Sequence, residues 1–159
     1  MPALSAGIVL CRLRTELEVL LVHPGGPFWA KKDLGAWSAP KGLVEPTEAP
    51  LAAALRELCE ELGTSSAPSP PHVPLPEVRL KSGKRVQLWA AGGEFDPAQL
   101  RSNQIELEWP PRSGRRALFP EVDRAEWFPR KAALTKVNQA QVPAIEACFS
   151  EAVRGALRL

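Results

Sequence analysis

Three glutamates, Glu57, Glu60 and Glu61, lie within five positions of a stretch with helical periodicity. On a helix, like charges three or four residues apart repel one another, and the dipole disfavours anions near a helix C-terminus. A hard divalent cation takes oxygen ligands and removes this repulsion. The cluster therefore predicts a Mg²⁺ or Mn²⁺ site, and an ordinary solvated helix face is the alternative interpretation.

The helix that carries these glutamates is predicted over residues 48–62. Thr47 is the expected N-cap, Pro50 lies in the first turn, and Gly63 is placed for a left-handed C-terminal cap. At 100° per residue, the glutamates share one arc of the helix and four leucines occupy another. This leucine stripe, expected to face the core, consists of Leu51, Leu55, Leu58 and Leu62.

The same stretch resembles the Nudix box, a pattern that combines spaced glycines with one Arg-Glu pair and one Glu-Glu pair. The matching residues are Gly42, Glu48, Arg56, Glu57, Leu58, Glu60, Glu61 and Gly63. Thr64 departs from the pattern, which has an aliphatic residue there. The segments "HPGGPFWAKKD", "AWSAPKG" and "EWPPRSGRRALFPEVDRAEWF" are similar to a bacterial subgroup of this MutT-like family whose box begins Pro-Lys-Gly.

This resemblance implies an α/β fold in which a mixed β-sheet is sandwiched between α-helices (α/β/α), with residues 1–159 as a single domain. It also implies hydrolysis of a nucleoside diphosphate linked to another moiety, with Mg²⁺ or Mn²⁺ as cofactor. Metal ions can neutralise phosphate charge, activate water and align the reacting groups.

Family roles carry over residue by residue. Glu57, Glu60 and Glu61 match the glutamates that hold metal, and Gly42 matches the position whose carbonyl completes the shell. Glu57 is the candidate general base, although the family places its base in different locations. The remaining box residues, Glu48, Arg56 and Gly63, are expected to be structural.

A further acidic ligand is expected outside the box. Glu121 precedes Trp127 by six residues, as in the corresponding family segment. An ordinary surface glutamate is the alternative, and Glu94, Glu106 and Glu108 are possible substitutes.

Candidate substrate-binding residues are Lys41 beside the box, Arg112 and Arg115 in "PPRSGRR", and Trp29. Lysine and arginine suit phosphate, and exposed aromatic rings can stack on a base. The Pro-Lys-Gly start resembles family members that act on dinucleoside polyphosphates, capped RNA or diphosphoinositol polyphosphates, and a dinucleoside polyphosphate is the expected substrate. A nucleoside triphosphate or a nucleotide sugar is the alternative, and a non-catalytic nucleotide-binding module is the second one. Neither His23 nor His72 has a partner at metal-like spacing.

Composition sets the remaining limits. The 20 basic and 18 acidic residues nearly balance, so charge gives no argument for a membrane or for a stable nucleic-acid complex, and neither is expected. No long apolar run is present, and three cysteines without metal-like spacing suit reduced thiols in a cytoplasmic protein. The sequence leaves the oligomeric state open.

Other elements follow from hydrophobic alternation and from turn residues. The proline-rich segment 68–76 is expected to be a connector that cannot pair regularly. A hairpin is predicted to turn at Ser82 and Gly83, whereas residues 96–120 show weak periodicity. The other predictions are a first hairpin formed by strands over 5–13 and 18–24, a short strand around Trp37, a last strand over 121–128, and one amphipathic helix over 138–157.

Overall fold

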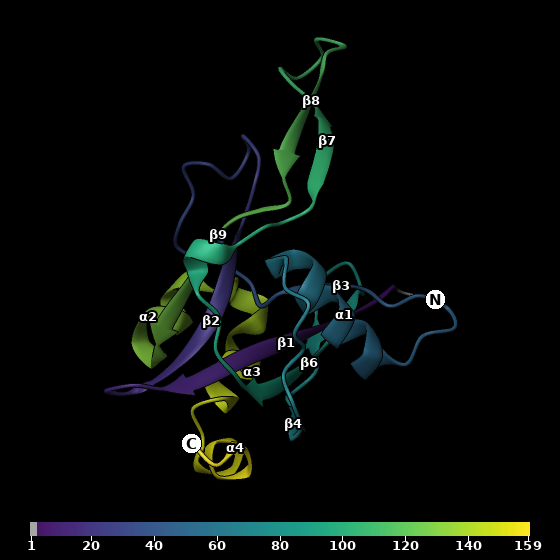
Figure 1. Cartoon of the computed structure of the whole chain (residues 1–159). Helices are drawn as coiled ribbons and strands as arrows, with labels where there is room; N and C mark the ends of the chain where they lie inside the picture. The colour runs from purple at the N-terminus through teal and green to yellow at the C-terminus, as the bar shows by residue number, and fades with distance from the viewer. Residues whose placement is uncertain (1–2) are drawn as a thin grey trace.

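The computed structural model describes residues 3–159 and shows helices on both sides of a mixed β-sheet (Figure 1). The elements in chain order are β1 (Leu4–Leu13), β2 (Leu17–Pro24), β3 (Lys41–Leu43), α1 (Pro50–Leu62), β4 (His72–Pro74), β5 (Val78–Arg79), β6 (Arg85–Gly92), η1 (Pro97–Gln99), β7 (Gln104–Glu108), β8 (Arg116–Pro120), β9 (Val122–Pro129), α2 (Arg130–Lys136), η2 (Gln139–Gln141), α3 (Val142–Ala147) and α4 (Glu151–Leu157).

The main sheet has the strand order β4-β6-β1-β2-β9, and the short strands β3 and β5 pair with β1 and β6. The predicted β1–β2 hairpin and the predicted turn between β5 and β6 are both present. Strands β1 and β6 run parallel over their length, with Ser5 beside Val86 and Gly7 beside Leu88. This parallel pair brings the start of β1, strand β3 and the β5–β6 turn to one end of the sheet.

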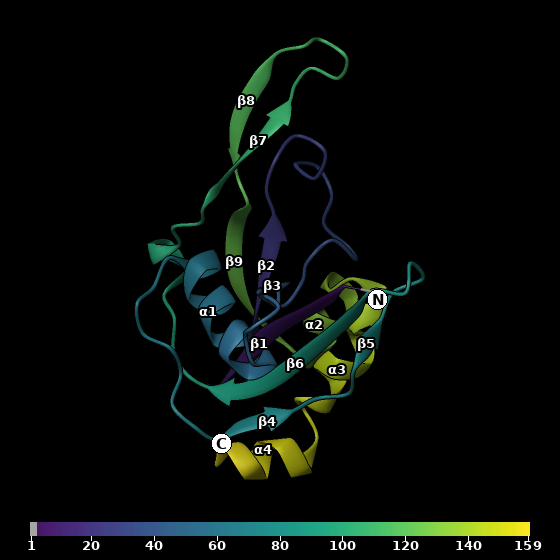
Figure 2. The ribbon, with the colours of Figure 1, turned by 90° about the vertical axis from the view of Figure 1, so that its right-hand side faces the viewer.

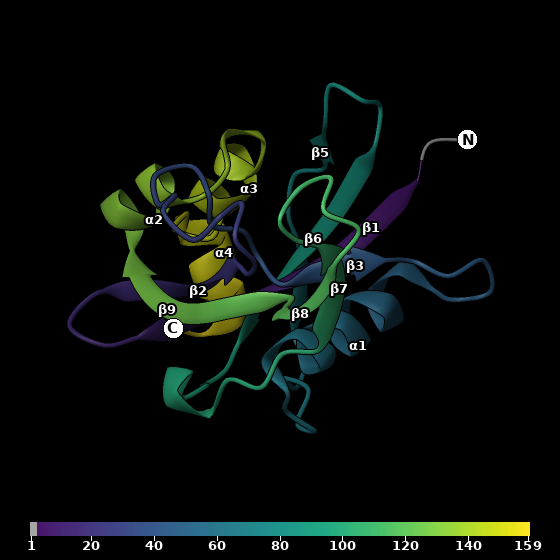
Figure 3. The same cartoon turned by 90° about the horizontal axis from the view of Figure 1, so that it is seen from above.

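Alternating residues of the central strands divide the core into two layers. Ile8, Leu20 and Val22 pack with α1 residues such as Leu58 on one face. Val9 and Leu21 belong to the cluster of the other face, which contains residues of α2, α3 and α4. Figure 3 shows α1 on one side of the sheet and the C-terminal helices on the other. The predicted α/β/α sandwich is therefore confirmed.

Helix α1 starts and ends for backbone reasons. The N-cap is Ala49 rather than Thr47, and no side chain caps the helix, so the predicted cap was wrong. Pro50 takes the first helical position, where its missing N–H costs nothing. Gly63 adopts the left-handed conformation (φ 73°), and a Cβ there would lie 2.2 Å from the carbonyl oxygen of Arg101. Of the leucine stripe, Leu58 and Leu62 are fully buried, whereas Leu51 and Leu55 pack at the margin of the core.

Three sequence predictions about local structure were wrong. The proline-rich connector does pair, because His72–Pro74 forms an edge strand against β6. Trp37 forms only isolated bridges, to Val137 and through its neighbour Ser38 to Val22. The C-terminal helix is broken into η2, α3 and α4, and α2 was not expected at all.

Strands β7 and β8 pair only with each other among the described residues, and they form a hairpin that projects from the body of the molecule (Figures 1 and 2). We call β7, β8 and their connection 109–115 the arm. The loop 25–35 rises beside the arm in both views, and the rings of Phe28 and Trp109 join the two with centroids 5.5 Å apart. The long apolar helix needed to cross a membrane is not found within residues 3–159.

Candidate active site

A cavity of about 380 Å³ opens where α1, β3, the β5–β6 turn and the start of β9 converge. It contains three carboxylates and two lysines. The lining residues are Ser5, Lys41, Gly42, Leu43, Glu57, Glu61, Lys84 and Glu121. The structure thus collects Glu121, which lies outside the box, beside the two box glutamates and Gly42.

The contact between Gly42 and Glu57 requires glycine. A Cβ on Gly42 would lie 2.0 Å from the carboxyl carbon of Glu57 and within 2.4 Å of both carboxylate oxygens. The carboxylate therefore rests directly on the backbone of β3. Since β3 also holds Lys41, one short strand positions a carboxylate of α1 and a lysine at the same cavity.

Glu61 is the most buried of the three box glutamates, with 7% of its surface exposed. Its Oε2 accepts a hydrogen bond from the backbone N–H of Lys41 at 3.2 Å. Burial, with the negative charge of Glu121 as a second cause, raises the pKa of Glu61 to about 8. Burial also raises the pKa of Glu57, and the charge of Glu121 contributes in the same direction. The buried carboxyl groups of Glu57 and Glu61 are therefore costly to ionise.

Arg56 ties the helix to the loop that precedes it. Its Nε and Nη2 bind the two carboxylate oxygens of Glu48 at 2.7 and 2.8 Å. This pairing lowers the pKa of Glu48 to about 2. The same guanidinium lies 2.9 Å from Glu57 and 3.2 Å from Glu60. Glu60 is the most exposed box glutamate, with 43% of its side chain accessible, and it does not line the cavity.

The donor set suits a hard divalent cation. Carboxylates of Glu57, Glu61 and Glu121 and the carbonyl of Gly42 are oxygen ligands of the kind that Mg²⁺ and Mn²⁺ take. Within residues 3–159, no three acidic, His or Cys side chains are already arranged as a metal cage. Glu57 instead accepts a hydrogen bond from the guanidinium of Arg56. A cation would offset the burial and the mutual repulsion that together raise the pKa values of Glu57 and Glu61.

Lys41 and Lys84 are the cations of the cavity. Lys41 was predicted as a phosphate contact, and its burial lowers the pKa of its ammonium group. Lys84 was missed. It lies 21 positions after Gly63, the last matching residue of the box, and only the parallel pairing of β1 with β6 brings the β5–β6 turn to this cavity.

Other predicted residues lie elsewhere. Arg112 and Arg115 occupy the tip of the arm and Trp29 lies in the loop 25–35, and these three do not line the cavity. Their role in substrate binding stays a prediction. The substitutes for Glu121 are also remote from the cavity: Glu94 pairs with Arg12 and Arg14, Glu106 pairs with Arg116, and Glu108 accepts the backbone N–H of Arg112.

The two histidines have structural partners. His23 is fully buried between Asp123 (Nδ1 to Oδ1, 2.8 Å) and the carbonyl of Lys32 (2.6 Å). His72 contacts the carbonyl of Pro68 at 2.9 Å. Neither lines the cavity of the box glutamates.

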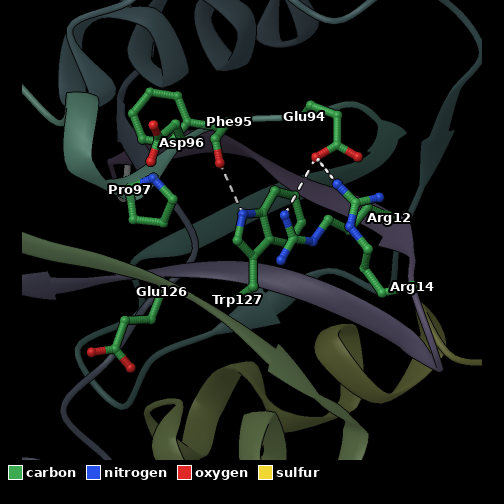
Figure 4. A pocket seen from close by; sticks show the side chains of 8 residues that line it. All are labelled: Arg12, Arg14, Glu94, Phe95, Asp96, Pro97, Glu126 and Trp127. Atoms are coloured by element: carbon green, nitrogen blue, oxygen red, sulfur yellow. Dashed lines mark hydrogen bonds and ion pairs between the residues drawn. The ribbon is translucent and has the colours of Figure 1, made fainter.

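A larger cavity, of about 670 Å³, lies at the opposite end of β1 (Figure 4). Its two arginines are paired with carboxylates. The Arg12 guanidinium lies 4.2 Å from the ring centroid of Trp127 and pairs with Glu18 and Glu94, and Arg14 also pairs with Glu94. Trp127 in turn donates to the carbonyl of Phe95. This cluster shares no residue with the candidate site.

The family assignment agrees with this geometry. The sequence model of the protein family described as NUDIX domain matches residues 1–148 of this chain. The chain belongs to the Nudix family. It is 31% identical to an RNA pyrophosphohydrolase of Brucella anthropi over 88% of this chain and 87% of that protein. The identity is also 31% to an RNA pyrophosphohydrolase of Rhizobium meliloti, over 89% of this chain and 95% of that protein.

A solved structure agrees at the level of the fold. The Nudix chain resembles a Caenorhabditis elegans Ap4A hydrolase in a binary complex, with a TM-score of 0.64 and 22% identity. The match covers 95% of this chain and 98% of that one. The protein is a Nudix pyrophosphohydrolase, a class of enzymes that generally use divalent metal ions.

Proposed function

We propose that this Nudix enzyme hydrolyses a phosphoanhydride bond of a dinucleoside polyphosphate with the help of Mg²⁺ or Mn²⁺. The observation that carries the proposal is the cavity in which Glu57, Glu61 and Glu121 face Lys41 and Lys84. Carboxylates beside lysines match a substrate that brings phosphate together with a divalent cation. Gly42 would add its carbonyl to the ligand set, and Glu60, which does not line the cavity, is the remaining predicted ligand.

Different residues of the chain would bind the phosphates and accept the proton of the attacking water. Lys41 and Lys84 bind nonbridging phosphate oxygens as point charges. Glu57, held against Gly42, is the candidate base that takes a proton from the attacking water, while the oxygen of that water bonds to phosphorus and the bridging P–O bond breaks. A bound divalent cation supplies charge neutralisation and lowers the pKa of water. Arg56 pairs with both Glu57 and Glu60 and so restrains their side chains.

A second substrate has specific support. Two relatives at 31% identity are named RNA pyrophosphohydrolases, which favours the 5′-polyphosphate end of an RNA. Nucleoside triphosphates and nucleotide sugars present the same phosphoanhydride and stay as alternatives. A module that binds without catalysis is disfavoured because Glu57, Glu60 and Glu61 are all present.

The test is a substrate panel assayed for released phosphate species. Diadenosine tetraphosphate, a 5′-triphosphate oligoribonucleotide, a nucleoside triphosphate and a nucleotide sugar are each incubated with Mg²⁺, with Mn²⁺ and with excess EDTA. We expect metal-dependent cleavage, fastest for the dinucleoside tetraphosphate. Equal turnover in EDTA would contradict the metal mechanism, and faster cleavage of the oligoribonucleotide would reverse the order of substrates.

A further inference from the structure

Three aromatic side chains are exposed on neighbouring segments at the end of the arm. Phe28 is 54% exposed, Trp29 40% and Trp109 37%. Phe28 and Trp29 come from the loop 25–35, and Trp109 starts the tip of the arm. Because Phe28 meets Trp109 edge to face, rings from two segments form one surface. Large rings left in solvent are typical of a binding site rather than of a core.

The same two segments contain four cations. Lys31, Lys32, Arg112 and Arg115 make no ion pair with any residue from 3 to 159. The ammonium of Lys32 lies 4.9 Å from the ring centroid of Trp29. The tip 109–115 contains two arginines and no acidic residue.

One acidic residue lies in the loop 25–35, and another directly precedes the tip of the arm. Asp33 accepts hydrogen bonds from Trp37 and Lys136, and Glu108 accepts the backbone N–H of Arg112. Lys136 offsets the charge of Asp33 whereas Glu108 keeps its charge, so four cations outnumber one unpaired carboxylate among the described residues of these segments, and the surface is locally basic although the whole chain is nearly neutral. We call Phe28, Trp29, Lys31, Lys32, Trp109, Arg112 and Arg115 the arm platform.

The arm connects this platform to the candidate active site. Glu121, which lines the carboxylate cavity, directly follows the last residue of β8. The five residues of β8 span roughly 17 Å at the usual rise per residue. In addition, the backbone N–H of Gly25, at the start of the loop 25–35, donates to the carbonyl of Glu121 at 2.9 Å. Both segments of the platform are thus anchored at the cavity and extend away from it.

We propose that the arm platform binds single-stranded nucleic acid, with bases stacked on the exposed rings and the backbone phosphates paired with the lysines and arginines. Stacking rings interleaved with unpaired cations are the features that recognise single strands without sequence readout. A protein partner with a mainly apolar surface would leave the four cations unpaired. A strand bound here would run along β8 toward the cavity, and its 5′ end would lie beside the glutamates.

The proposal rests on the proposed hydrolysis only for the direction of the strand. It departs from the expectation of no stable nucleic-acid complex, which was based on total charge. The local charge of a surface determines its binding instead, because charges separated by more than about 8 Å are largely screened at physiological salt.

The binding test uses an oligoribonucleotide of ten residues with a 5′-hydroxyl and a 3′ fluorophore, followed by fluorescence anisotropy at several salt concentrations. Removing both Arg112 and Arg115 (R112A/R115A) should lower the salt slope of log K by about 1.4, since each lost phosphate contact on a single strand removes about 0.7. Trp29→Ala should weaken binding at least tenfold through lost stacking. The matched control is R79A/K131A, which removes two exposed cations that make no ion pair within residues 3–159, and it should leave the slope unchanged.

Catalysis is scored separately. Glu57→Gln should abolish hydrolysis while retaining the oligonucleotide affinity, because the platform lies outside the cavity. Oligonucleotide binding by a protein that cleaves no phosphoanhydride would support the platform and overturn the proposed function. Affinity that is absent, or equal in parent, R112A/R115A and Trp29→Ala, would overturn the platform. A dimeric parent that becomes monomeric in Trp29→Ala without any change in RNA affinity would assign the surface to self-association and likewise overturn it.

Discussion

At the scale of single residues, Glu61 couples the candidate site to the stability of the fold. Its carboxyl group is buried beside Glu121, and its folded pKa of about 8 lies above the ordinary value of 4.5. Between these two values the folded state binds more protons than the unfolded state. The contribution of Glu61 to the free energy of unfolding is therefore complete below pH 4.5 and is lost as the pH rises through 8.

We accordingly predict that metal-free protein becomes less stable between pH 5 and pH 8, with a contribution from Glu61 of at most about 1.4 kcal/mol per pH unit. Urea unfolding in EDTA at four pH values measures this slope. Glu61→Gln has no proton to lose, so the slope should be shallower in that variant. Identical slopes in parent and variant would mean that Glu61 does not titrate in this window.

Glu60 gives a second prediction at this scale. Glu60→Gln removes a half-exposed ion pair with Arg56 and also the repulsion from Glu57 and Glu61, and these small effects oppose each other. We expect the free energy of unfolding in EDTA to change by less than about 0.5 kcal/mol. Initial rates with saturating Mg²⁺ should fall about a hundredfold if Glu60 is a metal ligand. Near-normal rates would mean that Glu60 binds no metal and only positions Arg56.

At the scale of elements, the sequence predicts what local chemistry determines. The β1–β2 hairpin, the turn before β6 and the C-terminus of α1 follow from alternation, from Ser-Gly and from Gly63. The box residues were identified by their spacing, and that spacing brings Glu57 and Glu61 to one cavity.

Elements that depend on tertiary contacts were missed. Strand β4 contains proline and lies at the sheet edge, where one side of the backbone needs no partner. The terminal helix breaks around Cys148 and Ser150, and Ser150 caps α4 with its hydroxyl. In the arm, β7 and β8 alternate half-buried and exposed residues, which gives only a weak hydrophobic signal.

Strand β3 permits a prediction about Gly42. In Gly42→Ala the new methyl group occupies the place of the Glu57 carboxylate, which lies at the flexible end of its side chain and can move. We expect the melting temperature to change little and the hydrolysis rate to fall at least tenfold, because Glu57 is displaced from the metal position. Gly63→Ala is the contrasting variant. Its methyl group meets the backbone of Arg101 at a positive φ, so stability should fall.

At the scale of the whole molecule, the sheet gathers charges that the chain keeps far apart. Positions 41, 57, 61, 84 and 121 meet at one end of the sheet because β1 pairs with β3 and with β6 there, and because β9 starts at the same end. The core that holds them is formed by two apolar layers, and neither layer contains the site. The acidic side chains therefore repel one another inside a scaffold that is stabilised elsewhere.

This arrangement predicts that divalent metal stabilises the entire fold. A cation that binds only the folded protein adds RT ln(1 + [L]/Kd) to the free energy of unfolding, which is about 2.7 kcal/mol at a hundredfold excess over Kd. For a chain of this size, that gain raises the melting temperature by roughly 5–10 °C. Thermal unfolding with Mg²⁺, with Mn²⁺ and with EDTA measures the shift without a substrate. The variant Glu57→Gln/Glu61→Gln is the control, because it lacks two of the carboxylates and should melt at one temperature in all three buffers. An equal metal shift in parent and control would place the cation somewhere other than the cavity between α1 and β3.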